Sequence, residues 1–492
     1  MASTSADTAS KGGKERASEL EQYTIEQIPL DQRHGKPRDL FTIWFTSNLM
    51  PLTIVTGALT TVLFGLPFWP ALIAIVLGNL IGAVFMALHS AQGPKLGIPQ
   101  MIQSRAQFGY YGAIAPLLLV IVMYLGFFSL GAVLGGNAIA SLLHVPVVVG
   151  IIVINAICLV AALFGYDLVH KLEGYAAYVF VVVFAIITIK LVSMGAPPAA
   201  QHTITIATVL LAISIPATWQ IGYAPYVADY SRYLPESTST AKAFWFTYIG
   251  SFVGASWTMI VGALGAWLAF DAATGNASSF FSGLLGGGFS WVILLVIILG
   301  IVGINTLNLY GPFMVTMTVL TSFKTFTMKG PALRLSITFV CCVIGTIAAI
   351  IIKDNLVDSF DAFLIFILYL LVPWTAINLM DFYLVRKGHY SIPDIYDPDG
   401  IYGKINWRTI GIYLASLLVE IPFMSLVFYT GPLALRLDGT DIAWILGLII
   451  PAVLYYVLTP DLRRQTDVLL KAGKITTGDG GTHTVAAQPD PA

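Results

Sequence analysis

The sequence predicts an all-α integral membrane protein with twelve transmembrane helices. Composition is the first reason, because 57% of the 492 residues are hydrophobic and only 10% are charged, whereas a soluble domain carries about 25% charged residues. The second reason is that the hydrophobic residues fall into stretches long enough to cross a bilayer. The third is that the first and the sixth of these stretches are each interrupted near the centre.

A helix needs about 20 apolar residues to cross the hydrocarbon core, and this requirement defines the predicted spans. The gaps Gly65–Pro67 and Leu143–Pro146 are short and predict tight turns between neighbouring helices. The predicted spans cover residues 41–63, 68–90, 112–143, 147–165, 172–193, 206–228, 243–270, 289–322, 333–352, 360–384, 408–430 and 441–459.

Basic residues predict the orientation, because Lys and Arg accumulate on the cytoplasmic side of membrane proteins. With the N-terminus inside, only Lys190, Lys353 and Arg436 of the 25 basic residues fall in outer loops. Both termini are therefore predicted to be cytoplasmic. The first 38 residues contain no apolar stretch typical of a signal peptide. We expect the plasma membrane, the inner membrane if the cell is bacterial, with a fungal plasma membrane as the alternative.

The two interruptions predict the domain organisation, because they lie about 170 residues apart. That spacing indicates an inverted repeat, in which spans 1–5 and spans 6–10 have opposite orientations in the bilayer. Spans 11 and 12 are then two extra C-terminal helices. Residues 1–25 and 475–492 have the composition of disordered tails. The predicted boundaries are 1–38 for the N-terminal tail, 39–195 and 205–388 for the repeats, 405–460 for spans 11–12 and 461–492 for the C-terminal tail.

The interruptions also predict where a ligand binds. Span 1 is broken at Ser47–Pro51, and span 6 is broken at Pro216–Gly222. A broken helix in lipid leaves backbone groups that only protein or a hydrated cavity can satisfy. Paired breaks in two repeats are the best sequence indication of a transporter's substrate site. The alternative is that Pro and Gly are simply frequent in membrane helices, but two breaks in matching positions favour the functional interpretation.

Other protein classes find no support in the sequence. The three cysteines, Cys158, Cys341 and Cys342, lie in apolar stretches and have neither disulfide nor metal-ligand spacing. There is no clustered His/Cys/Asp set, Gly-rich phosphate loop or nucleophile motif. The net charge of −1 indicates no nucleic-acid partner. We therefore expect neither an enzyme nor a resident cofactor or metal, and no repeated filter motif suggests a channel.

Four stretches, taken in order, resemble the nucleobase–cation symporter family and in particular its purine–cytosine permease branch. The resemblance covers about residues 25–460. It implies a fold of five plus five spans and cation-coupled import of a nucleobase or a related heterocycle, such as a hydantoin, allantoin, uracil, a pyrimidine vitamin precursor or a nucleoside. The coupling cation is a proton or sodium, and the oligomeric state stays open. The four stretches are Trp44–Asn48 with Gly57, Gly97–Gly109, Ala228–Tyr233, and Asp381–Gly388 followed by Tyr402, Asn406 and Trp407.

A nucleobase is flat, neutral and edged with donors and acceptors, and its site needs aromatic faces and amides. The resemblance implies a stacking aromatic residue about nine positions before Asp229, where this chain has Gln220 preceded by Trp219. We predict that Trp219 stacks on the base and that Gln220 bonds its edge. The resemblance aligns Phe127 with an aromatic residue on the opposite face of the base, although a Phe in a membrane helix is often ordinary packing.

Further amides and hydroxyls complete the predicted site. Asn305 and Asn308 lie one turn apart in span 8 and share a helix face, although such amides also bond neighbouring helices. Ser47 and Asn48 lie at the break of span 1, where they either face the substrate or cap the half-helix. The resemblance implies a polar residue in span 3 at the position where this chain has Gly131. Asn137, two turns further along the helix, can supply the missing polar contact.

The resemblance implies a sodium site made of span 1 carbonyls, here those of Leu49 and Met50, and two consecutive hydroxyl residues before the span 8 amide. This chain has Gly303 and Ile304 in place of the hydroxyls. A hard cation needs oxygen ligands, and the nearest hydroxyl, on Thr306, lies on another face of the helix. We therefore predict proton coupling in preference to sodium.

The carboxylates that could carry the proton are Asp229, Glu420, Asp381 and Glu173, and His89 at the end of span 2 could also titrate. Glu420 is the most deeply placed acid, near the middle of span 11, and acids within membrane spans are often functional. A hydrogen bond to a neighbouring helix is an equally good explanation. Asp381 lies close to Arg386 in the sequence, which indicates a structural ion pair.

Overall fold

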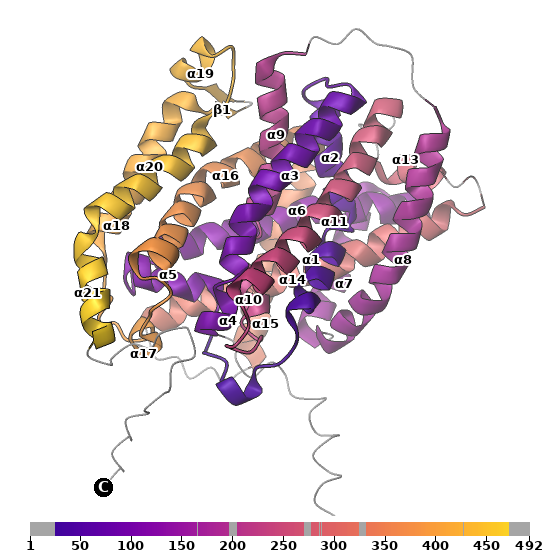
Figure 1. The fold of residues 1–492 in the computed structure, drawn as a ribbon. Coiled ribbons are helices and arrows are strands. Elements are labelled where there is room, and N and C mark those ends of the chain that lie inside the picture. Colours follow the sequence, from indigo (N-terminus) through magenta and orange to yellow (C-terminus); the bar gives the residue numbers. More distant parts are fainter. Residues whose placement is uncertain are drawn as a thin grey trace, which may run out of the picture.

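The computed structural model describes residues 25–164, 166–195, 204–269, 277–284, 286, 288–323, 331–426 and 428–471, and these residues are mostly helical (Figure 1). The α-helices are α1 (Pro37–Ser47), α2 (Pro51–Val62), α3 (Phe68–Ser90), α4 (Gly93–Leu96), α5 (Gln100–Phe108), α6 (Ile114–Leu143), α7 (Val147–Phe164), α8 (Tyr166–Ser193), α9 (Ile206–Ile221), α10 (Val227–Ser231), α11 (Thr240–Leu268), α13 (Ala277–Gly283), α14 (Ser290–Phe323), α15 (Pro331–Ile352), α16 (Leu356–Met380), α17 (Ile392–Ile395), α18 (Trp407–Glu420), α19 (Pro432–Arg436), α20 (Ala443–Leu458) and α21 (Pro460–Lys471). The shorter elements are the 3-10 helices η2 (Leu30–Gln32) and η4 (Ile421–Phe423), the π-helix η3 (Asp381–Val385), and the antiparallel strands β1 (Ser425–Leu426) and β2 (Tyr429–Thr430).

Each predicted span overlaps one of these helices. By length and apolar composition, six helices in the described part of the chain can cross a membrane, or up to eight if each bent helix pair forms one span. The bent pairs are α1 with α2 and α20 with α21, and three shorter apolar helices include α9. The protein is therefore a multi-pass membrane protein with an all-α architecture.

The predicted break of span 1 is confirmed. Helix α1 ends at Ser47, α2 begins at Pro51, and the two helices meet at an angle of 63°. Pro51 occupies the first turn of α2, where its missing N–H costs nothing. Met50 precedes it in an extended conformation, as the residue before a proline prefers.

The predicted break of span 6 is displaced towards the C-terminus. Pro216 lies inside α9, which continues to Ile221, and the chain then forms turns before α10 begins at Val227. Pro225 explains the position, because it lacks an N–H and disfavours a helical residue before it. Pro216 remains helical, and its ring packs on α3 at Gly78. A Cβ on Gly78 would lie 2.4 Å from Pro216 Cγ, so a side chain there would collide with the ring.

The predicted helix of span 11 is too long. Helix α18 ends at Glu420, and η4 and the β1–β2 hairpin occupy the remainder of the predicted range. Pro422 accounts for this end, because a proline inside a helix removes a hydrogen bond and clashes with the preceding turn. Helix α21 lies within the predicted C-terminal tail, whereas residues 1–24 and 472–492 lie outside the described residues.

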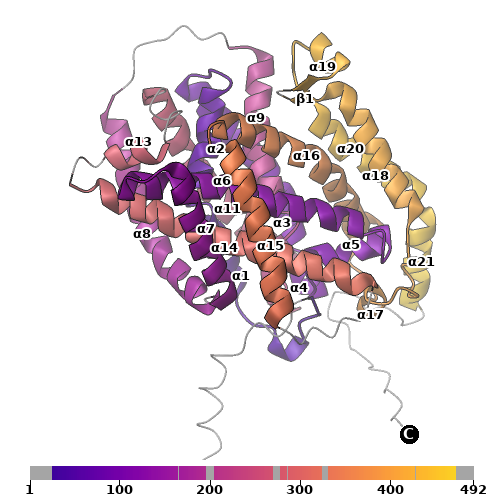
Figure 2. The ribbon, with the colours of Figure 1, turned by 180° about the vertical axis from the view of Figure 1, so that it is seen from behind.

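The centre of the protein is a bundle in which α1, α2, α9, α3 and α11 pack closely, with α6 and α14 side by side next to them (Figure 2). Glycines bring these backbones together. A Cβ on Gly57 of α2 would lie 1.9 Å from the carbonyl oxygen of Met259 in α11, and a Cβ on Gly262 would lie 1.9 Å from that of Ile54. Small residues allow such close approach between membrane helices. Helices α18 and α20 pack against α16 at one edge of the molecule (Figure 1).

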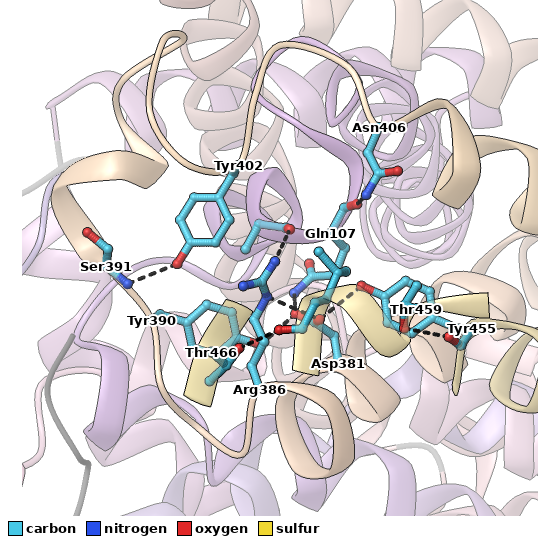
Figure 3. Close-up of polar contacts among 12 residues, drawn as sticks. Gln107, Asp381, Arg386, Tyr390, Ser391, Tyr402, Asn406, Tyr455, Thr459 and Thr466 are labelled. Carbon is cyan, nitrogen blue, oxygen red and sulfur yellow. Dashed lines mark hydrogen bonds and ion pairs between the residues drawn. The ribbon is translucent and has the colours of Figure 1, made fainter. Parts of the chain in front are cut away.

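A buried carboxylate joins several elements at one end of the bundle (Figure 3). Asp381 begins η3 and accepts hydrogen bonds from Gln107 Nε2 at 2.7 Å, Tyr390 Oη at 2.7 Å and Tyr455 Oη at 2.9 Å. Arg386 Nε lies 3.2 Å from Asp381 Oδ1, which confirms the predicted ion pair. Because these partners lie on α5, on α20 and in the segment after η3, one carboxylate holds three parts of the chain together.

Replacing Gly57 with Ala should destabilise the protein, because the new methyl group would overlap the backbone of α11. Overpacking of this kind costs about 1–3 kcal/mol. We expect a clearly lower melting temperature in detergent, measured by fluorescence-detected size-exclusion chromatography after heating. Gly411→Ala in α18 is the control, because a Cβ there meets no atom within 4 Å. A wild-type melting temperature for Gly57→Ala would contradict the close contact of α2 and α11.

Replacing Asp381 with Ala should be more damaging, because Arg386 would remain as a buried charge without its partner. Breaking a buried ion pair costs about 3–5 kcal/mol. The matched control is Asp461→Ala, since Asp461 pairs with Arg408 at 2.5 Å on the surface, where such pairs contribute about 0–1 kcal/mol. Thermal unfolding of both purified variants compares them, and equal melting temperatures would refute the structural role of Asp381.

Candidate substrate site

Two adjoining cavities lie beside the breaks of the two interrupted spans. The larger has a volume of about 530 Å³ and the smaller about 20 Å³. Tyr223, Tyr226, Ile304 and Asn308 line both of them. From these shared residues, the larger cavity extends to Arg232 near α10, at the lower end of the molecule in Figure 1. The remaining residues that line the smaller cavity are Met50, Leu52, Phe127, Trp219 and Gly222.

Trp219 and Phe127 come from different helices and meet at the smaller cavity. Trp219 lies in the last turn of α9, and Phe127 lies in α6. Their ring centroids are 5.9 Å apart and their planes are nearly perpendicular, at 86°. The structure therefore brings together the two aromatic residues that were predicted on opposite faces of the substrate, in an edge-to-face contact.

Three tyrosines extend the aromatic wall, and the sequence prediction missed them. Tyr223 and Tyr226 lie on either side of Pro225 in the break of span 6, and their centroids are 5.8 Å apart. Tyr124 lies one turn before Phe127 on α6 and is 5.4 Å from Tyr226. The sequence signal that could have identified Tyr223 and Tyr226 is their position close to Pro225, the proline in the turns after α9.

The two predicted amides of span 8 differ in position. Asn308 lines both cavities, and its Nδ2 donates to Asn305 Oδ1 at 3.3 Å. Asn305 is fully buried and donates to the carbonyl oxygen of Phe128 in α6 at 2.9 Å. A Cβ on Gly131 would lie 2.6 Å from Asn305 Oδ1, so the absence of a side chain at Gly131 leaves space for this amide. Only Asn308 of the pair borders the cavities.

The polar residues predicted at the breaks also differ in whether they line a cavity. Ser47 lines the larger cavity, and its hydroxyl donates to Ile43 O at 2.7 Å. Asn48 and Gln220 are fully buried and line neither cavity. Gln220 Nε2 donates to Asn79 Oδ1 at 2.7 Å, and Gln220 therefore bonds to α3. Asn137 is half-buried in α6 and borders neither cavity.

The residues predicted for cation coupling are dispersed. Met50 lines the smaller cavity, whereas Leu49 borders a separate apolar cavity of about 30 Å³ between α2, α6, α8 and α14. The hydroxyl of Thr306 donates to Val302 O at 2.6 Å within its own helix. The apolar Ile304 lines both the larger and the smaller cavity. Among the residues with a described position, no group of three His, Cys, Asp or Glu side chains is arranged to hold a metal ion.

Glu420 lies away from these cavities, at the C-terminal end of α18. It is fully buried, and neither carboxyl oxygen has a hydrogen-bond partner among the described residues. The carboxyl packs on α20 at Gly447, where a Cβ would lie 2.4 Å from Glu420 Oε1. Gly447 thus leaves space for the carboxyl, and the alternative of a hydrogen bond to a neighbouring helix is not found among the described residues.

Comparison with known proteins identifies the family. The family model described as a permease for cytosine/purines, uracil, thiamine and allantoin matches residues 27–447. The putative purine-cytosine permease YxlA of Bacillus subtilis (strain 168) is 44% identical over 449 residues, which cover 91% of this chain and 97% of that protein. The purine-cytosine permease fcyB of Emericella nidulans is 27% identical over 471 residues, covering 90% of this chain and 88% of that protein.

Solved structures agree on the fold. Mhp1, a nucleobase-cation-symport-1 family transporter solved in a closed conformation with bromovinylhydantoin bound, superposes with a TM-score of 0.71. The two chains are 17% identical, and the match covers 91% of this chain and 96% of that one. These findings confirm the resemblance carried by the four sequence stretches. The chain therefore belongs to the family of permeases for cytosine/purines, uracil, thiamine and allantoin, and it is a membrane transporter and not an enzyme.

Proposed function

We propose that this transporter imports a nucleobase, cytosine or a purine, together with a cation and by alternating access. The observation that carries the proposal is the meeting of Trp219, Phe127 and the Asn308 amide at a cavity beside both helix breaks. Aromatic faces hold a flat ring and an amide can both donate to and accept from its edge. The first relatives named above are purine-cytosine permeases, which supports the same substrate group.

The chemistry of the smaller cavity favours a neutral ligand. The nine residues that line it include no charged side chain. Ionised groups are expensive within a membrane, and a site of this kind is mostly apolar with a few placed polar groups. The larger cavity has a volume of about 530 Å³, within the range of roughly 300–1,000 Å³ that is usual for small-molecule sites.

Binding between the two rings requires a rearrangement. A base stacked on both sides needs about 7 Å between ring planes, because each stacked contact takes about 3.5 Å. Phe127 now meets Trp219 edge to face, with centroids 5.9 Å apart. We propose that Phe127 turns away from Trp219 when the substrate enters, whereas Trp219, which is 3% exposed, keeps its place.

Matching contacts in the two halves support the inverted repeat that alternating access requires. On α3, Gly78 and Gly82 let the backbone of α9 approach, since their Cβ positions lie 2.3 and 2.5 Å from the Ile213 and Ala217 carbonyl oxygens. On α11, Gly250 and Gly254 let the backbone of α1 approach, since their Cβ positions each lie 2.5 Å from a carbonyl oxygen, that of Phe41 and that of Phe45. A shift of 172 positions relates the two sets, pairing Phe41 with Ile213, Phe45 with Ala217, Gly78 with Gly250 and Gly82 with Gly254.

The same shift carries α1 onto α9 and α3 onto α11. Helix α3 packs on α9 as α11 packs on α1, and in chain order the α6–α7 contact corresponds to the contact between α14 and α15. We propose that spans 1–5 and 6–10 form the two repeats, within 39–195 and 205–388, and that spans 11 and 12 lie outside them. Twelve spans and cytoplasmic termini complete this topology.

The position of the larger cavity supports import as the proposed direction of transport. The larger cavity extends towards the end of the molecule that carries three basic residues. These are Lys95 on α4, Arg105 on α5 and Arg232 directly after α10. Because basic residues favour the cytoplasmic side, we assign this end to the cytoplasm and the protein to the plasma membrane. In this arrangement the larger cavity is the path by which the substrate leaves the site for the cell interior.

We propose the proton as the coupling ion. A sodium site needs several oxygen ligands, yet Ile304 presents an apolar side chain to the cavities, and the Thr306 hydroxyl donates to its own helix. Glu420 is the candidate proton carrier, because it is a fully buried acid whose oxygens have no partner among the described residues. Intramembrane acids of this kind are functional candidates.

A related heterocycle is the second candidate substrate. Gly131 gives its space to the Asn305 amide and presents no polar side chain of its own, which leaves fewer groups to select one particular base. The family description includes uracil, thiamine and allantoin, and Mhp1 was solved with a hydantoin bound. Uptake assays with these compounds therefore belong in the first experiment.

Replacing Trp219 with Ala should abolish useful uptake, because the stacking face is lost. Truncating an anchoring aromatic residue costs at least 2 kcal/mol, or roughly a 30-fold rise in KM. Uptake of labelled cytosine in cells measures the effect, and the amount of protein in the membrane is measured in parallel. Trp291→Ala is the matched control, since Trp291 is 53% exposed on α14. Wild-type uptake by Trp219→Ala would remove this residue from the site.

Uptake into proteoliposomes tests the substrate and the ion together. The purified protein is given cytosine, adenine, hypoxanthine, uracil or allantoin under an imposed pH gradient or an imposed sodium gradient. We expect accumulation of cytosine or a purine with the pH gradient alone. Glu420→Gln should lose this accumulation while retaining exchange of labelled for unlabelled substrate. Accumulation driven by sodium would overturn proton coupling, and wild-type accumulation by Glu420→Gln would exclude Glu420 as the carrier.

A further inference from the structure

We infer that Asn48 is a positioning residue, which orients the ring of Trp219 on the cavity wall without contacting the substrate. The inference deepens the proposed function and rests on it for the role of Trp219. Asn48 Oδ1 accepts a hydrogen bond from Trp219 Nε1 at 2.8 Å and one from Tyr223 Oη at 3.3 Å. One amide oxygen thus holds two of the aromatic residues that line the smaller cavity.

The amide of Asn48 has only one orientation that satisfies its neighbours. Its Nδ2 donates to Trp44 O at 2.7 Å and to Ser251 Oγ at 3.2 Å. The indole N–H of Trp219 can only donate and the carbonyl of Trp44 can only accept. The oxygen must therefore face Trp219 and the nitrogen must face Trp44. All four hydrogen-bonding positions of the amide are used, and none is left for a ligand.

The location of Asn48 agrees with this role. Asn48 is fully buried and lines neither cavity, although its sequence neighbours Ser47 and Met50 line one each. The side chain thus points away from the substrate path and into the bundle. A change at Asn48 would reach the substrate through the indole that it holds.

A hydrogen-bonded chain anchors Asn48 to three further helices. Ser251 Oγ in α11 donates to Gln220 Oε1 in α9 at 2.6 Å, and Gln220 Nε2 donates to Asn79 Oδ1 in α3 at 2.7 Å. The shift of 172 positions relates Asn48 to Gln220 and Asn79 to Ser251. Both broken spans are thus tied, at equivalent positions, to helices of the central bundle. Within this series of hydrogen-bonded side chains, Asn48 is the member that bonds to aromatic residues lining the smaller cavity.

Geometry distinguishes this role from simple capping of α1. A capping residue needs only to satisfy the helix end, which Nδ2 does through Trp44 O. The oxygen is on the other side of the amide and satisfies the indole, which is 3% exposed. A buried N–H that loses its acceptor is costly, so without Asn48 the indole would turn to find another partner.

A double-mutant cycle tests the inference through KM. Asn48→Ala removes the acceptor, and Trp219→Phe keeps an aromatic face but removes the N–H. We expect Asn48→Ala to raise the KM for the transported base about ten-fold in the wild-type background, the equivalent of one lost hydrogen bond. In the Trp219→Phe background the same substitution should raise KM less than about two-fold, because the indole N–H is already absent and the longer bond from Tyr223, at 3.3 Å, is the one of the two that is then lost.

Asn79→Ala is the matched control. Asn79 is equally buried, of the same residue type and part of the same hydrogen-bonded chain, but it contacts neither Trp219 nor the cavities. Its removal should lower the melting temperature, because Asn79 also donates to Ile75 O and Met259 Sδ, and should leave KM within about two-fold of the wild-type value. An equal rise of KM in both backgrounds of the cycle, or in Asn79→Ala, would overturn the inference.

A measurement without substrate separates this inference from the proposed function. In protein labelled with ¹⁵N-tryptophan, the Trp219 indole resonance is assigned by its absence in Trp219→Phe, and its exchange with deuterium is followed. Exchange should be slow in the wild type and in Asn79→Ala, and at least ten-fold faster in Asn48→Ala, as expected for a lost hydrogen bond. Unchanged exchange in Asn48→Ala would refute the inference even if every base were transported. Absence of uptake by the wild type would refute only the proposed function.

Discussion

The lack of water in a bilayer is the constraint on which this structure depends. Every backbone N–H and C=O within the membrane must find a partner in the protein, yet two helices of this chain are interrupted. At the first break, the amide of Asn48 serves the Trp44 carbonyl. At the second, short turns from Thr218 to Tyr226 provide the bonds. The two adjoining cavities lie beside these two places, where the backbone departs from a helix.

Glycine makes these interruptions tolerable by bringing intact helices against the broken ones. Helix α11 contacts α1 at Gly250 and Gly254 and contacts α2 at Gly262, while α3 contacts α9 at Gly78 and Gly82. Contacts this close allow no side chain between the helices, so their relative position is fixed by the backbones themselves. Trp219 and Met50, which line the smaller cavity, then project from elements whose position is set by an unbroken neighbour.

The sequence predicted the helices well, because long apolar stretches are a strong signal, and it predicted the break at Pro51 from local residues alone. It misplaced the second break because Pro216 and Pro225 look alike in sequence. The structure distinguishes them, because Pro216 lies inside α9 and packs on α3 at Gly78, whereas Pro225 lies in the turns that follow α9. Trp219, Phe127 and Asn308 line the smaller cavity, whereas Gln220 bonds to α3, and their predicted contacts with a substrate stay a prediction. Which way a buried amide points depends on neighbouring helices, and no local pattern encodes that choice.

The pairing of Asn48 with Gln220 has a consequence for the history of the chain. If the two halves descend from one duplicated segment, these residues occupy a single ancestral position, and Asn79 and Ser251 occupy another. An ancestor of five helices would then have inserted in both directions and assembled as a pair of identical subunits, each with the same polar contact. After fusion, one copy of the position came to support an aromatic residue at the cavity and the other remained between helices. On this premise, the asymmetry of the cavity wall would be more recent than the symmetry of the surrounding helices.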